Sequence, residues 1–386
     1  MKRKGLNIGV ISVGRSENLG DAVISKSIEL SLLEVDNNTN VSFFDLDYGE
    51  YSLEESLEPK ENTKISSFKK RTYYPRAFYN LFRVLTDANF KNKLESFVHD
   101  KDLILIGGGH LLIDNYCYFS AKLYLVANLC LKLKVRYEIW CVGVSKTHSL
   151  LSKTLLKSVL NYKIVYTRDT NSTLHIKSIM GGKVKVKSLM DPAIFIGKFQ
   201  AIKPIKKYDV AIGIMDPGEM VRHSGVYVTR EDFALKYINL INKLLENKMN
   251  ILIFTNGNNN DFLFSKNYIY EKIILKDNLH FAKKPVNYGD IIVSLNSSNI
   301  VFAQRLHALL PALVMNKSVI GLEWDNKLKS IFSDLGTSSS LLKPNFCYEN
   351  IYEIIINENN KVNKSYNKID EFRALYLECL EEVLNG

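Results

Sequence analysis

The sequence predicts an α/β protein of two doubly wound, Rossmann-like domains followed by a helical tail. Three observations support this fold class. Short apolar runs rich in Val and Ile alternate with longer amphipathic runs, the pattern of parallel strands joined by crossover helices. This alternation pauses once, in a lysine-rich stretch, and then restarts. The chain has 386 residues, which is more than one ordinary hydrophobic core organises.

The N-terminal half contains six short apolar runs that we interpret as strands. The first, "LNIGVISV", follows basic residues and superficially resembles a signal peptide. It is short, Asn7 and Ser12 interrupt it, and no small-residue cleavage site follows, so a strand is the better interpretation. Apolar residues at helical spacing predict helices over 21–35 and 149–161. The predicted strands are 6–13, 40–46, 102–107, 137–144, 163–168 and 185–190.

The pause in the pattern covers 195–209, which contains Pro204 and several lysines. We therefore expect an N-terminal domain at 1–198, a C-terminal domain at 206–345 and a helical tail at 346–386. In the second domain the predicted strands are 208–215, 249–257, 278–283, 299–304 and 318–324, and the predicted helices are 230–248, 287–298, 306–316 and 326–336. Two such domains facing a cleft form a GT-B-like arrangement, and the carboxyl ends of parallel strands are where such sheets bind ligands.

Composition indicates a soluble globular protein with a basic balance. The formal net charge is +10, from 51 Lys and Arg against 41 Asp and Glu. A compositional bias explains this charge, and an anionic partner is the functional alternative. No nucleic-acid-binding signature is present. Five cysteines form no CxxC pair, and the apolar segment 123–135 is too short to span a bilayer. We expect a cytoplasmic protein.

Two strand-to-helix turns of the first domain contain candidate ligand-binding residues. In "GRSENLGDA" a glycine turn and a helix cap explain Gly20 and Asp21, but they do not explain Asn18. In "LILIGGGHLLID" the three glycines Gly107, Gly108 and Gly109 allow close backbone approach and can present N–H groups to an anion or a sugar. His110 and Asp114 share a face if this segment is helical, but two side chains do not make a metal site.

Arginines stand at two further turns. In "VYTRDTNSTLHI" Asp169 is a natural helix cap, whereas Arg168 has no evident local role and suits an anion clamp. In "AQRLHALLPALVMN" Arg305, Leu306 and His307 lie where a strand gives way to a helix. A helix N-terminus attracts anions, arginine offers a planar fork, and histidine transfers protons near neutral pH. A half-buried structural histidine is the alternative for His307.

In this order, these turns resemble the polysaccharide pyruvyl transferase family. The matching stretches are "NLGDA", "GGGHLLID", "TRDTNS" with "DPA" at 191–193, and "QRLHALLPA" running into "IGLEWDNK". The resemblance covers roughly residues 8 to 336 and implies a GT-B-like fold. It also implies transfer of the enolpyruvyl carbons of phosphoenolpyruvate onto two hydroxyls of a sugar in a cell-surface polysaccharide or its lipid-linked precursor. The product is a cyclic ketal, and phosphate leaves.

The resemblance also implies roles for the candidate residues. Arg168, Arg305, Leu306 and His307 would bind the donor, with Arg305 and His307 as catalytic residues. The acceptor would lie against residues of the N-terminal turns. These are Asn18, Gly20, Asp21, Gly107, Gly108, Gly109 and Asp114. No metal or cofactor is expected, since no side-chain cluster has ligand spacing and arginines can meet the donor's charge.

Two other functions fit the same sequence. A GT-B glycosyltransferase using a nucleotide sugar would need a ribose-binding carboxylate, for which Glu323 and the loop "TNGNNND" at 255–261 are candidates. A glycan-binding protein that kept the fold without catalysis is the other alternative.

The segment "KKRTYYPRAFYNLFRVL" at 69–85 interleaves basic and aromatic residues. This composition suits an anionic interface, so we expect peripheral contact with the inner face of a membrane, where a lipid-linked acceptor would be found. A core helix with solvated basic residues is the alternative.

Overall fold

The structure is a computed structural model that describes residues 5–55, 73–161, 163–182, 184–198, 207–224, 227–359 and 367–386. Its contacts divide the chain into two compact units. The N-terminal unit consists of Met1–Arg15, Ile24–Pro192 and Ala374–Gly386, and the C-terminal unit consists of Ser16–Val23 and Ala193–Arg373. The predicted tail at 346–386 therefore divides between the units, and a short N-terminal segment groups with the C-terminal half.

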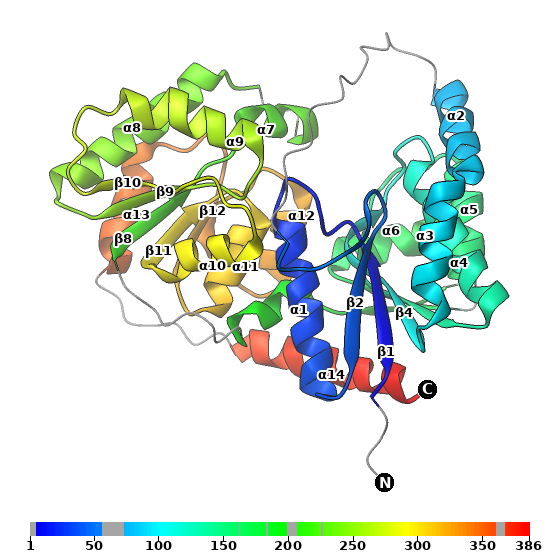
Figure 1. Ribbon diagram of the computed structural model, residues 1–386. Helices are drawn as coiled ribbons and strands as arrows, with labels where there is room; N and C mark the ends of the chain where they lie inside the picture. Colours follow the sequence, from blue (N-terminus) through cyan, green and yellow to red (C-terminus); the bar gives the residue numbers. More distant parts are fainter. Residues whose placement is uncertain are drawn as a thin grey trace. The chain divides into compact units, whose positions relative to one another are not determined.

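The N-terminal unit is built on one sheet with the strand order β3-β2-β1-β4-β5-β6-β7. Figure 1 labels β1, β2 and β4 of this sheet. All neighbouring strands are parallel except β3, which runs antiparallel to β2. The strands are β1 Asn7–Ser12, β2 Asn40–Asp45, β3 Gly49–Tyr51, β4 Leu103–Leu112, β5 Arg136–Val144, β6 Ile164–Thr167 and β7 Lys185–Ser188. The α-helices that begin in this half are α1 Gly20–Val35, α2 Tyr73–Thr86, α3 Ala88–His99, α4 Tyr118–Leu133, α5 Leu150–Leu160 and α6 Thr170–Met180.

The C-terminal unit has a second parallel sheet with the order β10-β9-β8-β11-β12-β13. Its strands are β8 Tyr208–Gly213, β9 Ile251–Phe254, β10 Leu279–Phe281, β11 Ser298–Ala303, β12 Ser318–Leu322 and β13 Leu341–Leu342. Its helices are η1 Pro192–Lys198, α7 Pro217–Ser224, α8 Arg230–Glu246, α9 Asn259–Phe264, α10 Tyr288–Asn296, α11 Leu306–Val314, α12 Asn326–Asp334 and α13 Tyr348–Asn359, while α14 Asn367–Asn385 continues into the other unit.

The predicted fold class is confirmed: both sheets have the doubly wound order in which strands are added outward on each side of the first one. Each unit has its own core. In the N-terminal unit the apolar face of α4, with Leu123, Val126 and Cys130 at helical spacing, packs in the cluster that contains Ile104 of β4. In the C-terminal unit α8 packs in the cluster that contains Phe302 of β11.

The prediction that the three glycines form a turn after a strand ending at residue 107 is wrong. Strand β4 continues through them to Leu112, with a bulge that shifts its register against β5. The reason is close packing. A Cβ on Gly107 would lie 1.6 Å from the carbonyl oxygen of Trp140, and one on Gly108, where φ is +72°, would lie 2.3 Å from Ile28 of α1. Only at Gly109 would a side chain meet nothing within 4 Å.

Among the described residues, no helix combines the length and the apolar character needed to cross a membrane.

Candidate functional site

The C-terminal sheet places Arg305 at its switch point. Strands β8 and β11 lie side by side in the middle of the sheet, and the chain winds outward from them in opposite directions. Ligands of doubly wound sheets bind beyond the carboxyl ends of such a strand pair. Asp216 follows β8 and Arg305 follows β11, so both lie at this edge of the sheet.

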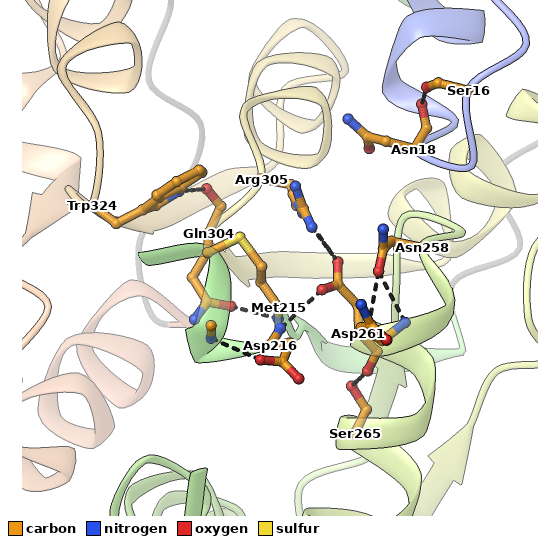
Figure 2. Close-up of polar contacts among 12 residues, drawn as sticks. Ser16, Asn18, Met215, Asp216, Asn258, Asp261, Ser265, Gln304, Arg305 and Trp324 are labelled. Carbon is orange, nitrogen blue, oxygen red and sulfur yellow. Dashed lines mark hydrogen bonds and ion pairs between the residues drawn. The ribbon is translucent and has the colours of Figure 1, made fainter. Parts of the chain in front are cut away.

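Arg305 is held by a buried carboxylate that the sequence analysis did not assign to it (Figure 2). Its Nε and Nη2 donate to Oδ2 of Asp261 at 3.1 and 2.7 Å. The Asp261 side chain is completely buried, whereas the Arg305 side chain is 15% exposed. A guanidinium gripped along one edge by a carboxylate has a fixed plane. The interaction therefore orients Arg305 and leaves its Nη1 without a hydrogen bond to any described residue.

Three hydrogen bonds, each involving a backbone group of Asp261 or of its partner, fix Asp261 in place. Its other oxygen, Oδ1, accepts from the N–H of Asp216 at 2.9 Å. Its own N–H donates to the side chain of Asn258, which caps α9. Ser265 donates to its carbonyl at 2.6 Å. Burial raises the pKa of Asp261, and the nearby Arg305 charge opposes this shift only in part. The ion pair thus holds the Arg305 guanidinium in place, at the cost of removing the Asp261 carboxylate from water.

Two further residues tie the strand ends together around Arg305, and sequence reasoning missed them. Gln304 is buried, and its side-chain oxygen accepts from the N–H of Met215 after β8 at 2.9 Å. Trp324, after β12, donates from its indole N–H to the carbonyl of Gln304 at 2.7 Å. The residue before Arg305 is therefore anchored to the strands on both sides of β11 (Figure 2). A polar residue ending a buried strand was the available sequence signal.

His307 lies two residues further on, at an irregular position of α11. Helix α11 begins at Leu306 with Arg305 as its N-cap, and the Arg305 side chain makes no capping hydrogen bond. The backbone of His307, with φ −84° and ψ 18°, is not helical. Pro311 explains this, because proline four residues later has no N–H for the His307 carbonyl and its ring crowds that carbonyl. His307 is 8% exposed.

The segment 16–23 packs against this site within the C-terminal unit. Leu19 donates its N–H to the carbonyl of Asn256 at 2.9 Å. A Cβ on Gly257, where φ is +100°, would lie 2.6 Å from the carbonyl oxygen of Glu17. A Cβ on Gly20 would lie 2.6 Å from Nδ1 of His307. Gly257 and Gly20 therefore allow the segment 16–23 to approach the site closely. This approach brings Gly20 into contact with His307, and the two residues were predicted separately from the sequence.

The other candidates of this segment lie beside Gly20. Asp21 falls within the first turn of α1, because the helix already begins at Gly20, so Asp21 is not the cap that the sequence suggested. The Asp21 carboxylate accepts from the Ser16 hydroxyl at 2.6 Å, and the same hydroxyl lies 2.8 Å from the carbonyl of Asn18. Figure 2 shows Asn18 with the other residues of the site.

Arg168 belongs to the N-terminal unit, where it has two acidic neighbours that the sequence analysis did not assign to it. Its Nη1 donates to Asp191 at 3.1 Å, and its Nε lies 3.8 Å from Asp169. Asp169 caps α6 as predicted, accepting from Ser172. Arg168 is 1% exposed, and its Nε and Nη2 have no hydrogen-bond partner among the described residues. It is a buried cation with unused donors.

Asp114 has a structural environment in the N-terminal unit. It accepts from the Tyr73 hydroxyl and the Ser149 N–H at 2.5 Å each, and from the Cys117 N–H at 3.2 Å. Burial opposes its ionisation, but the hydrogen bonds from Tyr73 and Ser149 outweigh burial and lower the pKa of Asp114. His110 lies on β4, not on a helix, and its Nε2 is 3.0 Å from the Ser145 hydroxyl.

The structure therefore brings Arg305, Leu306, His307, Asn18, Gly20 and Asp21 into one unit, and it places Arg168, the three glycines of β4 and Asp114 in the other. Among the described residues, no group of three or more His, Cys, Asp or Glu side chains could hold a metal ion.

The two doubly wound, Rossmann-like units place this chain in the GT-B-like fold class of α/β proteins. Solved structures share this fold at low sequence identity. UDP-GlcNAc 2-epimerase from Methanocaldococcus jannaschii has a TM-score of 0.57 and 10% identity over 99% of this chain and 100% of its own. A putative UDP-N-acetylglucosamine 2-epimerase from Listeria monocytogenes has a TM-score of 0.56 and 10% identity, covering 96% and 91%. A trehalose-6-phosphate synthase has a TM-score of 0.54 and 12% identity, covering 98% and 99%.

The family is shown by sequence. The family model described as polysaccharide pyruvyl transferase matches residues 18–326. The chain therefore belongs to the polysaccharide pyruvyl transferase family, as its motifs predicted. No curated protein matches the chain.

The contact between Gly20 and His307 predicts an energetic coupling. Gly20→Ala should destabilise the protein by about 1–3 kcal/mol, the usual cost of overpacking, because the new methyl group collides with the imidazole. In a His307→Gly background both the imidazole and the His307 Cβ, which would lie 2.8 Å from the new methyl group, are gone, so most of this cost should disappear. Denaturant unfolding of the four proteins of this double-mutant cycle measures the coupling. Equal costs of Gly20→Ala in both backgrounds would show that the two residues do not press on one another.

Proposed function

We propose that this protein is a ketal pyruvyl transferase that uses phosphoenolpyruvate and modifies two hydroxyls of a sugar in a cell-surface polysaccharide or its lipid-linked precursor. The observation that carries the proposal is Arg305, pre-oriented by Asp261 at the switch point and at the start of α11. Membership of the family supports pyruvyl transfer to a polysaccharide. The donor and the acceptor sugar are part of the proposal.

The donor's charges match the site. Phosphoenolpyruvate has a carboxylate and a phosphate, and both suit a planar guanidinium and a helix N-terminus. Arg305 would bind one of these anions through Nη1 and the face turned away from Asp261. The backbone N–H of Leu306, the first residue of α11, would add to this anion site. Arg168, which lies in the N-terminal unit, stays a proposed anion ligand on its own account, because two of its guanidinium nitrogens lack acceptors among the described residues.

The proposed reaction begins with protonation of the donor's methylene carbon by the His307 imidazolium. The carbon that bears the phosphate becomes cationic, and one sugar hydroxyl adds to it and returns a proton to His307. The second hydroxyl then displaces phosphate, which leaves with that hydroxyl's proton. The products are a cyclic ketal with a new methyl group and inorganic phosphate. This sequence is balanced without an oxidant, a metal or a cofactor.

The acceptor assignments can be ranked by their surroundings. Asn18, Gly20 and Asp21 remain proposed acceptor ligands, because their segment lies against His307. Gly109 has open space beside its Cα, whereas close packing already explains why Gly107 and Gly108 are glycines. The oxygens of Asp114 already accept three hydrogen bonds.

A GT-B glycosyltransferase that uses a nucleotide sugar is the second candidate, because the fold is shared with UDP-GlcNAc 2-epimerases and a trehalose-6-phosphate synthase. The two carboxylates proposed for ribose binding are already engaged. Asp261 forms an ion pair with Arg305, and Glu323 forms one with Lys343 at 2.9 Å. These contacts favour the pyruvyl transferase over this alternative.

The test of the proposed function is phosphate release from phosphoenolpyruvate in the presence of a chelator and a panel of aryl and lipid-linked glycosides. We expect release that depends on one class of glycoside, together with a product heavier than the acceptor by one pyruvate ketal. Release of a nucleotide from a sugar nucleotide with the same panel would support the glycosyltransferase. Binding of a glycoside with no turnover of either donor would support the non-catalytic protein.

Arg305→Lys keeps the positive charge but loses the planar fork. We expect donor affinity to weaken by about 1.5–3 kcal/mol, the range for a hydrogen bond to a charged group. Calorimetric titration with phosphoenolpyruvate measures this change. Arg373→Lys is the matched control, because Arg373 lies in the same unit and donates to the carbonyl of Ile194. Unchanged donor affinity in Arg305→Lys would remove Arg305 from the donor site.

His307→Ala removes the proposed acid without removing the arginine. Donor affinity should stay close to that of the wild type, while turnover should fall by roughly a hundredfold or more, the usual contribution of general acid–base catalysis. Initial rates and a melting curve on the same sample separate this role from packing. A structural histidine would instead lower the melting temperature and leave the turnover of the folded fraction near normal.

A further inference from the structure

Helix α2 exposes its aromatic residues instead of burying them. The relative exposures of Tyr74, Phe78, Tyr79 and Phe82 are 57%, 59%, 62% and 68%. Tyr74, Phe78 and Phe82 are four residues apart, so they form one stripe along the helix, with Tyr79 beside it. The alternative of a core helix with solvated basic residues is therefore wrong for this segment. Lys69, Lys70 and Arg71 lie outside the described residues.

The inner face of α2 buries little apolar surface and is attached in part by polar contacts, unlike that of an ordinary surface helix. Ala77 and Val84 are its buried residues. Tyr73 bonds to Asp114 at 2.5 Å, and the Asn80 amide donates to the carbonyl of Tyr116 at 3.1 Å. These contacts attach α2 to the unit without using the aromatic stripe. The stripe is thus an apolar surface held in a fixed orientation.

Positive charge accompanies this surface. Helix α2 contains no acidic residue, and Arg76 and Arg83 lie over the rings of Tyr116 and Tyr118, at 4.1 and 5.1 Å from the ring centroids. Both arginines are solvent-exposed. A helix with aromatic residues on its outer face and arginines on its flank has the composition of helices that lie in a lipid headgroup layer.

A cavity of about 270 Å³ lies beside the last turns of α2. Its wall includes three basic residues and two acidic ones, a formal balance of +1: Arg83, Lys93, Lys122, Asp47 and Asp87. Lys122 forms an ion pair with Asp47 at 2.7 Å, and Asp87 caps α3. Lys93 is solvent-exposed, like Arg83. Asp47 and Asp87 are solvent-exposed as well, so the positive charge beside the aromatic residues comes from Arg76 and Arg83 and not from this cavity.

We propose that the aromatic face of α2, defined by Tyr74, Phe78, Tyr79 and Phe82, docks the N-terminal unit onto an anionic lipid bilayer. Charge complementarity selects this occupant over a second copy of the chain. A two-fold contact through the same helix would set Arg76 and Arg83 against the same arginines of the other copy. An anionic bilayer accepts both the rings and the arginines. The proposal does not depend on the reaction catalysed by the protein.

Vesicle flotation of the full chain tests the docking. The probes are vesicles of phosphatidylcholine mixed with phosphatidylglycerol and vesicles of phosphatidylcholine alone, each at low and high salt. We expect flotation with the anionic vesicles that weakens as salt increases and is much smaller with the neutral ones. No flotation with anionic vesicles would overturn the proposal.

Substitutions locate the surface. The double substitution Phe78→Ser and Phe82→Ser should weaken partitioning onto anionic vesicles at least about tenfold, because two aromatic rings are no longer transferred from water into the bilayer. The matched control is Leu150→Ser with Leu174→Ser, which removes two leucines that are 76% and 58% exposed in the same unit. All four positions are exposed, so melting curves should coincide. Equal losses in both pairs, or a wild-type dimer in sedimentation equilibrium that the phenylalanine pair abolishes, would contradict docking on lipid.

Discussion

The ion pair between Asp261 and Arg305 is the contact around which the C-terminal unit arranges its site. A charged group buried at the end of a sheet is costly unless its partners are fixed. Here the cost falls mainly on Asp261, whose pKa is raised by burial. The strand ends supply the fixed partners: Asp216 after β8 donates its N–H to Asp261, and Arg305 follows β11. The hydrogen bonds that satisfy the Asp261 carboxylate also fix the plane of the Arg305 guanidinium.

A second constraint acts on His307. Pro311 prevents the regular hydrogen bond to the His307 carbonyl, so the first turn of α11 is irregular where the imidazole begins. Gly20 then lies against the imidazole with no room for a side chain. Backbone irregularity on one side and a glycine on the other restrict the position of the ring. The role proposed for His307, proton transfer to one carbon atom, would benefit from such restriction, since positioning is a large part of the catalytic advantage.

Much of this arrangement could be predicted from the sequence, and the part that could not involves contacts between distant residues. The strands were predictable because buried parallel strands are continuous apolar runs. Arg305 and His307 were predictable because they stand where β11 gives way to α11. Asp261 was not, because it is 44 residues from Arg305 and only the strand order β9-β8-β11 brings the two turns to one edge. The glycines of β4 were misplaced because the close approach of Trp140 is invisible in sequence.

Asp114, which the sequence analysis singled out as an acceptor ligand, has structural partners that the sequence does not reveal. Its carboxylate binds the Tyr73 hydroxyl at the start of α2, the Cys117 N–H before α4 and the Ser149 N–H before α5. These bonds lower its pKa, so the stability that they contribute is present above the ordinary pKa of an aspartate and is lost as the pH falls. The anchoring fixes α2 by its inner face. An aromatic stripe that faces water is unfavourable by itself, and the anchored inner face is what keeps the helix from turning that stripe inward.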